Sequence, residues 1–195
     1  MTNYIQFHSY KAGVGTTTTA VMTALKLAEQ GRVLFVDTSE SRDVHLLFGV
    51  SQQNMQQVMD SLWLLDGSDH GLSTDFVVVD AGLNEFVWKP RRAITSDDIY
   101  QRVVVSNNTY QSLKPTASSR FPRDSHVMNV SIVNPQLTLT GRDCQMVLQR
   151  DGVIIPWDAR IATRNDAGTW AHFQSTGLPN VHQPLTELVN HITNK

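Results

Sequence analysis

The sequence lacks the features of a secreted or membrane-inserted protein. Cys144 is its single cysteine, so the chain cannot form an internal disulfide, which fits a reducing compartment. The N-terminus has neither the cationic start nor the apolar run of a signal peptide. No apolar stretch reaches the roughly 20 residues that a membrane-spanning helix needs. We therefore expect a cytoplasmic protein.

An excess of positive charge is also absent. The chain has 16 Lys and Arg residues against 18 Asp and Glu residues, and its formal net charge of -2 creates no overall field that would attract nucleic acid. Segment 185–195 has little apolar face and does not resemble a basic amphipathic membrane anchor, so we expect no membrane binding. Non-specific DNA binding would need local basic clusters. Two are candidates, although each also fits scattered solubilising charge: Lys89, Arg91 and Arg92, and Lys114, Arg120 and Arg123.

Two kinds of catalytic site are missing from the sequence. None of the 7 histidines pairs with another histidine or with a cysteine at the spacing of zinc ligands. The sequence also has no G-x-S-x-G motif, so a hydrolase triad is not expected. Cys144 falls in a predicted helix and is expected to be a core residue rather than a nucleophile.

What the sequence does contain is an alternation of strand-like and helix-like segments. Strands are expected at 4–8, 32–37, 76–80, 103–105, 127–133 and 153–155. Helices are expected at 17–30, 55–65, from 110 to slightly beyond 113, 141–149 and 185–192. Gly31 should end the first helix as a C′ glycine, Thr140 and Asp143 resemble a capping box, and 114–125 should be a surface loop.

The strand composition indicates how the sheet is built. The runs ending in Asp37 and Asp80 are continuously apolar and rich in β-branched residues, as in strands that are covered on both faces of a parallel sheet. Strands separated by helices favour right-handed crossovers. We therefore predict one α/β domain over 1–195, with a doubly wound, mostly parallel sheet flanked by helices.

The most informative segment lies between the first strand and the first helix. It reads Ser9-Tyr10-Lys11-Ala12-Gly13-Val14-Gly15-Thr16-Thr17-Thr18-Thr19. The two glycines let backbone N–H groups turn inward, and the helix N-terminus behind them adds partial positive charge, as in a phosphate-binding loop. A Walker A motif, however, ends in Gly-Lys-Ser/Thr, and Thr16 stands where the lysine belongs. A plain glycine turn capped by threonines remains the alternative.

Several segments resemble the ParA/MinD family of P-loop ATPases. Segment 11–17 resembles that family's deviant Walker A loop, K-G-G-x-G-K-T, except at Thr16. Segment 32–37 resembles the strand that ends in the Walker A′ aspartate, and 75–82 resembles the Walker B strand and switch. Three further segments resemble the short helix after the Walker A′ strand, the strand whose asparagine meets adenine, and the loop that closes over the base: 43–50, 132–135, and 155–158 followed by Ala162 and Gly168.

The resemblance implies roles for individual residues. Lys11 matches the lysine that reaches the phosphates across a dimer, and Asp37 matches the acid that orients the attacking water, so both would be catalytic. Thr17 and Asp80 match the residues that hold Mg²⁺. Gly82 matches the glycine that senses the γ-phosphate. The other positions expected to contact ATP are Ala12, Gly13, Val14, Gly15, Thr16, Thr18, Asn134, Pro156 and Asp158, with Asn134 at the base.

Each assignment has a structural alternative in the sequence itself. Lys11 also fits a solvated loop lysine, and Asp37 and Asp80 fit strand-end acids that face solvent. Asn134 precedes a proline and is a good turn former. Asp158 fits a helix N-cap.

The resemblance implies an ATP- and Mg²⁺-dependent homodimer that segregates DNA or positions a cargo through an adaptor protein. Thr16 offers a neutral hydrogen bond, worth about 0.5–1.5 kcal/mol, where a charged group would offer about 1.5–3 kcal/mol. We therefore expect weak nucleotide binding and weak or absent ATP hydrolysis. A pseudo-ATPase scaffold without turnover is the alternative. A small-molecule kinase or synthetase would need a substrate pocket that the sequence does not reveal.

Overall fold

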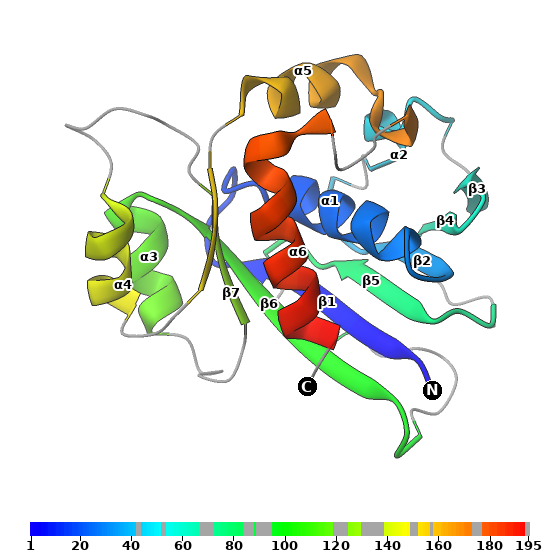
Figure 1. Ribbon diagram of the computed structural model, residues 1–195, viewed down its shortest axis with the longest axis horizontal. Coiled ribbons are helices and arrows are strands. Elements are labelled where there is room, and N and C mark those ends of the chain that lie inside the picture. The colour runs from blue at the N-terminus through cyan, green and yellow to red at the C-terminus, as the bar shows by residue number, and fades with distance from the viewer. Residues whose placement is uncertain are drawn as a thin grey trace.

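The computed structural model describes residues 1–41, 44–51, 54–66, 72–83, 88, 95–118, 125–129, 139–148, 152–156, 158–172 and 177–193. Its described strands form one sheet in the order β3-β4-β2-β5-β1-β6-β7-β8. Neighbouring strands are parallel except β3 and β4, which are antiparallel (Figure 1). The strands are β1 (Asn3–Ser9), β2 (Val33–Asp37), β3 (Met55–Met59), β4 (Leu62–Asp66), β5 (Phe76–Asp80), β6 (Ile99–Asn107), β7 (Ser125–Asn129) and β8 (Val153–Ile155).

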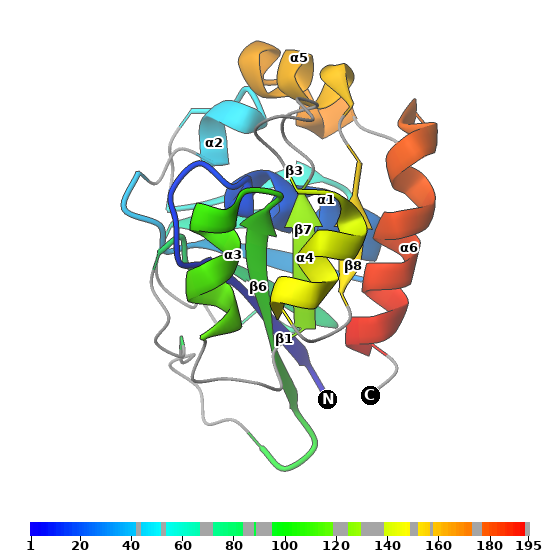
Figure 2. The same ribbon diagram turned by 90° about the vertical axis from the view of Figure 1, so that its left-hand side faces the viewer.

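Helices cover both faces of this sheet. On one face, α1 (Thr16–Ala28) and α6 (Pro179–Thr193) enclose the main core with Ile5 and Phe7 of β1 and with Ile155 of β8. On the other face, α3 (Tyr110–Ala117) and α4 (Gly141–Leu148) pack against Ile154 (Figure 2). The neighbours Ile154 and Ile155 thus face opposite layers, as the alternation of side chains along a strand requires. The predicted doubly wound, mostly parallel α/β sheet is confirmed.

The carboxyl ends of the parallel strands carry the remaining short elements. α2 (Val44–Leu47), α5 (Ala159–Ala167) and the 3₁₀ helix η1 (Trp170–His172) follow β2 and β8. In Figures 1 and 2, α2 and α5 lie at the same end of the molecule. This is the edge where crevices form outside an open α/β sheet.

An aromatic cluster on the sheet surrounds the side-chain amide of Gln6. Tyr4 stacks on Tyr100 with ring centroids 6.3 Å apart. The hydroxyl of Tyr100 donates to Gln6 Oε1, and the same oxygen accepts from the backbone N–H of Trp88 at 2.8 Å. The cluster therefore fixes Trp88, in the connection from β5 to β6, against β1.

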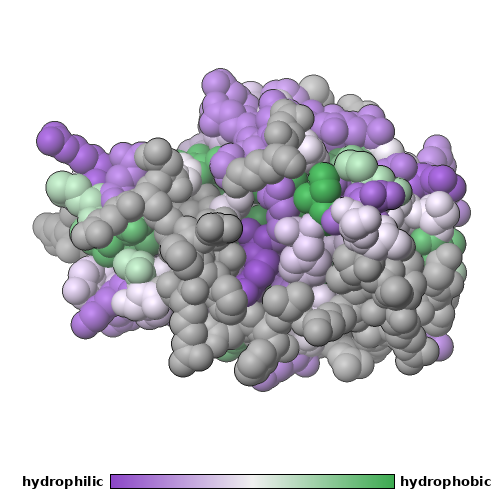
Figure 3. Space-filling model, turned by 90° about the horizontal axis from the view of Figure 1, so that it is seen from below, coloured by the Kyte–Doolittle hydropathy of each residue, from purple (hydrophilic) through white to green (hydrophobic). Residues whose placement is uncertain are grey.

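None of the helices in the described part of the chain combines the length and apolar character needed to cross a lipid bilayer. In the view from below, hydrophilic side chains dominate the described surface and hydrophobic ones form small, separate areas (Figure 3).

Three sequence predictions were wrong. Segment 55–65 is not a helix but the hairpin of β3 and β4, because β4 pairs with β2 and buries Leu62 and Leu64. Gly31 does not have the left-handed backbone of a C′ glycine; a Cβ there would lie 2.7 Å from Asp75 Oδ2, so the glycine leaves room for that carboxylate. The predicted loop 114–125 begins inside α3, which continues to Ala117, and its last residue, Ser125, opens β7.

The capping box at α4 is confirmed. The N–H of Thr140 donates to Asp143 Oδ2, and the N–H of Asp143 donates to Thr140 Oγ1, each at 3.2 Å. The hydroxyl of Thr140 also donates to Asp143 Oδ2, at 2.7 Å, and this bond, followed by that from the Thr140 N–H, lowers the pKa of Asp143. α6 starts earlier than predicted, at Pro179, and contains Pro184.

Candidate functional site

The loop between β1 and α1 has the backbone of a phosphate-binding loop. Gly13 has a φ of 72° and Gly15 a φ of 88°, both in the left-handed region that favours glycine. Gly15 is also the N-cap of α1. Because glycine has no side chain to cap the helix, the N–H groups of the first turn are left for a ligand. The loop therefore presents amides and a positive helix end to one side.

A cleft with about 790 Å³ of open space lies between this loop and the residues that follow β2 and β5. We call it the phosphate-side cleft, after the ligand expected from the sequence. Half of its described lining residues carry a hydroxyl group: Ser9, Thr16, Thr17, Thr18, Ser39 and Ser41. Ala12, Gly13, Gly15, Glu40, Gly82 and Leu83 complete the described lining. None of these residues is a lysine or an arginine, so neutral hydroxyls and backbone amides supply the described donors of this cleft.

Two buried acids stand beside this cleft at the ends of adjacent strands. Asp37 of β2 and Asp80 of β5 are register partners and are 6% and 0% exposed. Asp80 Oδ1 accepts from the N–H of Gly82 at 3.0 Å. In this conformation the Gly82 amide is thus directed to Asp80. The carbonyl of Gly82 accepts from the N–H of Ser9 at 2.8 Å, which ties the segment after β5 to the phosphate loop.

Asp37 organises the turn after β2. Its Oδ1 accepts from the N–H of Ser39 at 3.0 Å and from the hydroxyl of Ser39 at 2.6 Å. Its Oδ2 accepts from the N–H of Val44, the first residue of α2, at 3.2 Å. Asp37 is therefore not a solvated strand-end acid.

A second, more apolar cleft lies on the other side of the loop, below α5. It has about 580 Å³ of open space and shares Gly13, Gly15 and Thr18 with the first cleft. The rest of its lining is formed by Val14, Met22, Asn129, Ile155, Pro156, Asp158, Ile161, Ala162 and Asn165. A ligand in contact with Gly13 and Gly15 can thus extend into a hydroxyl-rich space on one side and an apolar space on the other.

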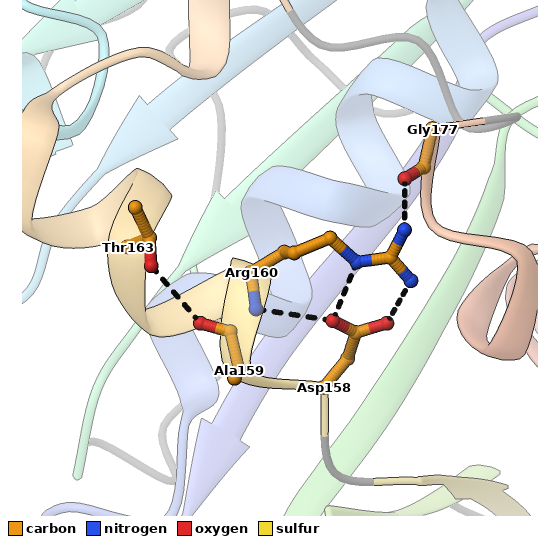
Figure 4. A network of polar contacts seen from close by, with 5 residues as sticks. All are labelled: Asp158, Ala159, Arg160, Thr163 and Gly177. Atoms are coloured by element: carbon orange, nitrogen blue, oxygen red, sulfur yellow. Dashed lines mark hydrogen bonds and ion pairs between the residues drawn. The ribbon is translucent and has the colours of Figure 1, made fainter.

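Asp158 is the N-cap of α5. Its Oδ1 accepts from the N–H of Arg160 at 3.0 Å and from Arg160 Nε at 2.8 Å, and its Oδ2 accepts from Arg160 Nη2 (Figure 4). Arg160 Nη1 reaches the carbonyl of Gly177 at 3.0 Å. The hydrogen bond from the Arg160 side chain, with its charge, lowers the pKa of Asp158. Asp158 therefore fixes the start of α5 at the rim of the apolar cleft.

The ion pair at Asp158 predicts a pH dependence. A lowered pKa means that the stabilisation is complete above the ordinary Asp pKa of about 3.9 and is lost as the pH falls through the lowered value. An Asp158→Asn variant, which can still cap α5 but cannot pair with Arg160, should therefore be less stable than the wild type by a constant amount between about pH 8 and 5. Urea denaturation should show this difference shrinking below about pH 4. A gap that widens on acidification contradicts the assignment.

Two asparagines connect the clefts to distant parts of the chain. Asn129, the last residue of β7, donates from Nδ2 to the carbonyl of Val14 at 2.9 Å and to Thr19 Oγ1 at 2.8 Å. Asn165 of α5 donates to Thr18 Oγ1 at 3.2 Å and accepts from Trp170 Nε1 at 2.8 Å. The sequence analysis missed both. Asn129 lies inside the predicted strand 127–133, whereas β7 ends at this residue. A strand predicted to end at Asn129 would have identified it as a strand-end residue beside the site.

Solved structures with a similar fold include ATPases of the ParA and MinD type. A ParA family ATPase from Chlorobium tepidum has a TM-score of 0.71 at 16% identity, over 98% of this chain and 99% of that chain. MinD from Pyrococcus horikoshii with Mg-ADP has a TM-score of 0.69 at 18% identity, over 99% and 96%. McdA from Cyanothece, in its ATP complex, has a TM-score of 0.67 at 13% identity, over 100% and 96%.

The chain has the ParA/MinD ATPase fold. No family model matches the sequence. No curated protein is significantly similar to it either. The relationship is therefore visible in the fold and not in overall sequence similarity.

Within the ParA/MinD fold, most of the sequence-predicted site residues come together. Ala12, Gly13, Gly15, Thr16, Thr17, Thr18 and Gly82 line the phosphate-side cleft, and Val14, Pro156 and Asp158 line the apolar cleft. Lys11 is half-buried in the loop itself. Asn134, the predicted base contact, lies outside the described residues, as do Lys89, Arg91, Arg92, Arg120 and Arg123 of the basic clusters. Lys114 is exposed on α3.

Proposed function

We propose that this protein is a ParA-type nucleotide switch that binds Mg-ATP and dimerises when the nucleotide is bound. The observation that carries the proposal is the meeting of two unlike clefts at Gly13, Gly15 and Thr18. A hydroxyl-rich space next to a helix N-terminus suits phosphates. An apolar space on the other side of the loop suits a planar base. A nucleoside polyphosphate has both parts in one molecule.

The chain's own residues fit Mg-ATP. The amides around Gly13 and Gly15 would hold the phosphates, and the hydroxyl of Thr17 and the buried carboxylate of Asp80 would hold Mg²⁺. Bound Mg-ATP supplies a transferable phosphoryl group. Asp37 would position a water molecule for attack, and Lys11, from its own or a partner subunit, would neutralise phosphate charge. The role of Asp37 would require it to exchange its present hydrogen bonds with Ser39, and a role of the Gly82 N–H at the γ-phosphate would require it to leave Asp80.

Hydrolysis is proposed to be slow. Phosphoryl transfer depends on positioning and on neutralising charge that is spread over the phosphate oxygens. Thr16 brings no cation, and the described lining of the phosphate-side cleft contains Glu40 but no lysine or arginine.

The same observation favours a second candidate, a pseudo-ATPase scaffold that binds nucleotide and partners without turnover. In either case the role would be DNA segregation or cargo positioning through an adaptor protein, with non-specific DNA contacts at Lys89, Arg91, Arg92, Lys114, Arg120 and Arg123.

Nucleotide titration combined with size measurement tests the proposal. Purified protein should bind Mg-ATP by calorimetry, and sizing by light scattering should show dimers with ATP and monomers with ADP or without nucleotide. Turnover in a phosphate-release assay would separate the switch from the scaffold. Absence of any ATP binding at millimolar concentrations would overturn both candidates.

Gly15→Ala provides the site-directed version of the same test. A Cβ at Gly15 would lie 2.7 Å from Asn129 Nδ2, and the φ of 88° is strained for alanine, so ATP binding should fall by about tenfold or more. Gly177→Ala is the matched control, because its Cβ would meet nothing closer than 3.9 Å. Equal ATP affinity in the two variants would place the nucleotide elsewhere.

A further inference from the structure

We propose that Asn129 is a positioning residue that aims the phosphate-loop amides into the nucleotide site; the inference rests on the function proposed above. Asn129 lies at the carboxyl end of β7, more than a hundred residues from the loop, as its sequence separations of 115 and 110 from Val14 and Thr19 show. Its Nδ2 donates to Val14 O at 2.9 Å and to Thr19 Oγ1 at 2.8 Å, and lies 3.4 Å from Gly15 O.

These contacts connect Asn129 to the carbonyls of two consecutive loop residues, Val14 and Gly15. The hydroxyl of Thr19 accepts from Asn129 and donates to Gly15 O at 2.8 Å. The carbonyl of Val14 is thus held by Asn129 directly. The carbonyl of Gly15 accepts from both the backbone N–H and the hydroxyl of Thr19, so the first turn of α1 holds it and Asn129 acts on it chiefly through that hydroxyl. Linked hydrogen bonds of this kind strengthen one another in a protein interior.

The directions of the two carbonyls determine the directions of two amides. In a trans peptide the C=O and the N–H lie in one plane and point in opposite directions. The carbonyl of Val14 shares its plane with the N–H of Gly15, and the carbonyl of Gly15 shares its plane with the N–H of Thr16. Holding the Val14 carbonyl toward Asn129 therefore turns the N–H of Gly15 away from β7, while the first turn of α1 sets the direction of the Thr16 N–H. Gly15 and Thr16 both line the phosphate-side cleft.

This arrangement has particular weight in a loop with two left-handed glycines and no lysine at position 16. Glycine loses more conformational freedom on ordering than any other residue, so an untethered loop would sample many backbone states. Asn129 also occupies the space beside Gly15, because a Cβ there would come within 2.7 Å of Nδ2. The side chain thus both tethers the loop and limits its alternatives before any nucleotide binds.

The decisive variant is Asn129→Asp, which keeps the shape of the side chain and removes the donor at neutral pH. Asn107→Asp is its matched control. Asn107 is the register partner of Asn129 on β6, and its Oδ1 only accepts hydrogen bonds, from the N–H and the hydroxyl of Thr109, which a carboxylate retains. Both variants add a negative charge at the same edge of the sheet. Because Asn129 lines the apolar cleft and Asn107 lines neither cleft, Asn129→Ala, which adds no charge, separates the lost donor from repulsion of the phosphates.

Two readouts distinguish positioning from general stability. In the nucleotide-free protein, hydrogen exchange of the Thr19 amide, which reports on the loop through its bond to the Gly15 carbonyl, should become several-fold faster in Asn129→Asp and stay unchanged in Asn107→Asp, with exchange in α6 equal in both. Mg-ATP affinity should fall about 5–30-fold in Asn129→Asp relative to the control, because one or two hydrogen bonds are lost. The ratio should approach one as the pH is lowered, because a protonated carboxyl group can again donate to Val14 O.

The outcomes separate this inference from the proposed function. If the wild type binds no nucleotide, the proposed function fails, and faster loop exchange in Asn129→Asp still supports the tether. If the wild type binds Mg-ATP and Asn129→Asp matches Asn107→Asp in affinity and in loop exchange, the inference is overturned. A loss of affinity in Asn129→Asp that does not depend on pH also overturns it. Should Asn129→Asp fail to fold, Asn129→Ala removes the donor without adding charge and should give the same loop exchange.

Discussion

A Thr16→Lys variant is expected to bind Mg-ATP about 5–30-fold more tightly than the wild type. A hydrogen bond to a charged donor contributes about 1–2 kcal/mol more than one between neutral groups, and each 1.4 kcal/mol corresponds to a factor of ten. Thr16 lines the phosphate-side cleft, whose open space of about 790 Å³ can accommodate the longer side chain. Calorimetric titration with Mg-ATP measures the gain directly.

The control for this variant is Gln111→Lys, which adds the same charge at an exposed position on α3, away from both clefts. It should leave the affinity unchanged, since surface charges at a distance are screened by salt. A Thr16→Lys protein no tighter than this control would show that the segment is an ordinary glycine turn and not a phosphate-binding loop. A rise in ATP turnover together with affinity would favour the switch over the scaffold.

Gly168→Ala is expected to cause the largest loss of stability. Gly168 follows α5 with a φ of 61°, and a Cβ there would lie 2.5 Å from the carbonyl of Leu46 and 3.2 Å from Gly49 Cα. Left-handed backbone costs an alanine about 1–2 kcal/mol, and overpacking against backbone adds about 1–3 kcal/mol. For a chain of this size, the sum corresponds to a fall in Tm of about 4–20 °C, which thermal denaturation would detect.

Gly13→Ala separates the two contributions to this loss. Gly13 has a φ of 72°, but no atom lies within 4 Å of the position its Cβ would take. This variant should therefore show the backbone cost alone. Equal losses in the two variants would mean that the close approach of Gly49 to Gly168 can relax without cost.

The contact between these two glycines also connects the two sides of the site. Gly49 follows α2, whose first N–H binds Asp37 beside the phosphate-side cleft. Gly168 follows α5, which covers the apolar cleft and reaches Thr18 through Asn165. The turn after α2 and the end of α5 therefore lie against each other through backbone atoms, with no space for a side chain between them.

The sequence by itself determined the features that depend on neighbouring residues. The strands Phe76–Asp80 and Val153–Ile155 were predicted at their observed bounds, because a short apolar run rich in β-branched residues has few other stable environments. The glycine loop between β1 and α1, the capping box of α4 and the N-cap role of Asp158 also follow from local patterns, since each is built by groups a few residues apart.

Only the tertiary structure decided the features that depend on contacts distant in sequence. Segment 55–65 became a hairpin because β2 offered an edge to β4, which outweighed the segment's helical pattern. The tether from Asn129, the link from Asn165 to Thr18 and the approach of Gly49 to Gly168 join residues that no local spacing relates. The local sequence determines which backbone conformations have low free energy for a segment. Hydrogen bonds and close contacts between distant segments form only when the chain has folded, so the local sequence cannot reveal them.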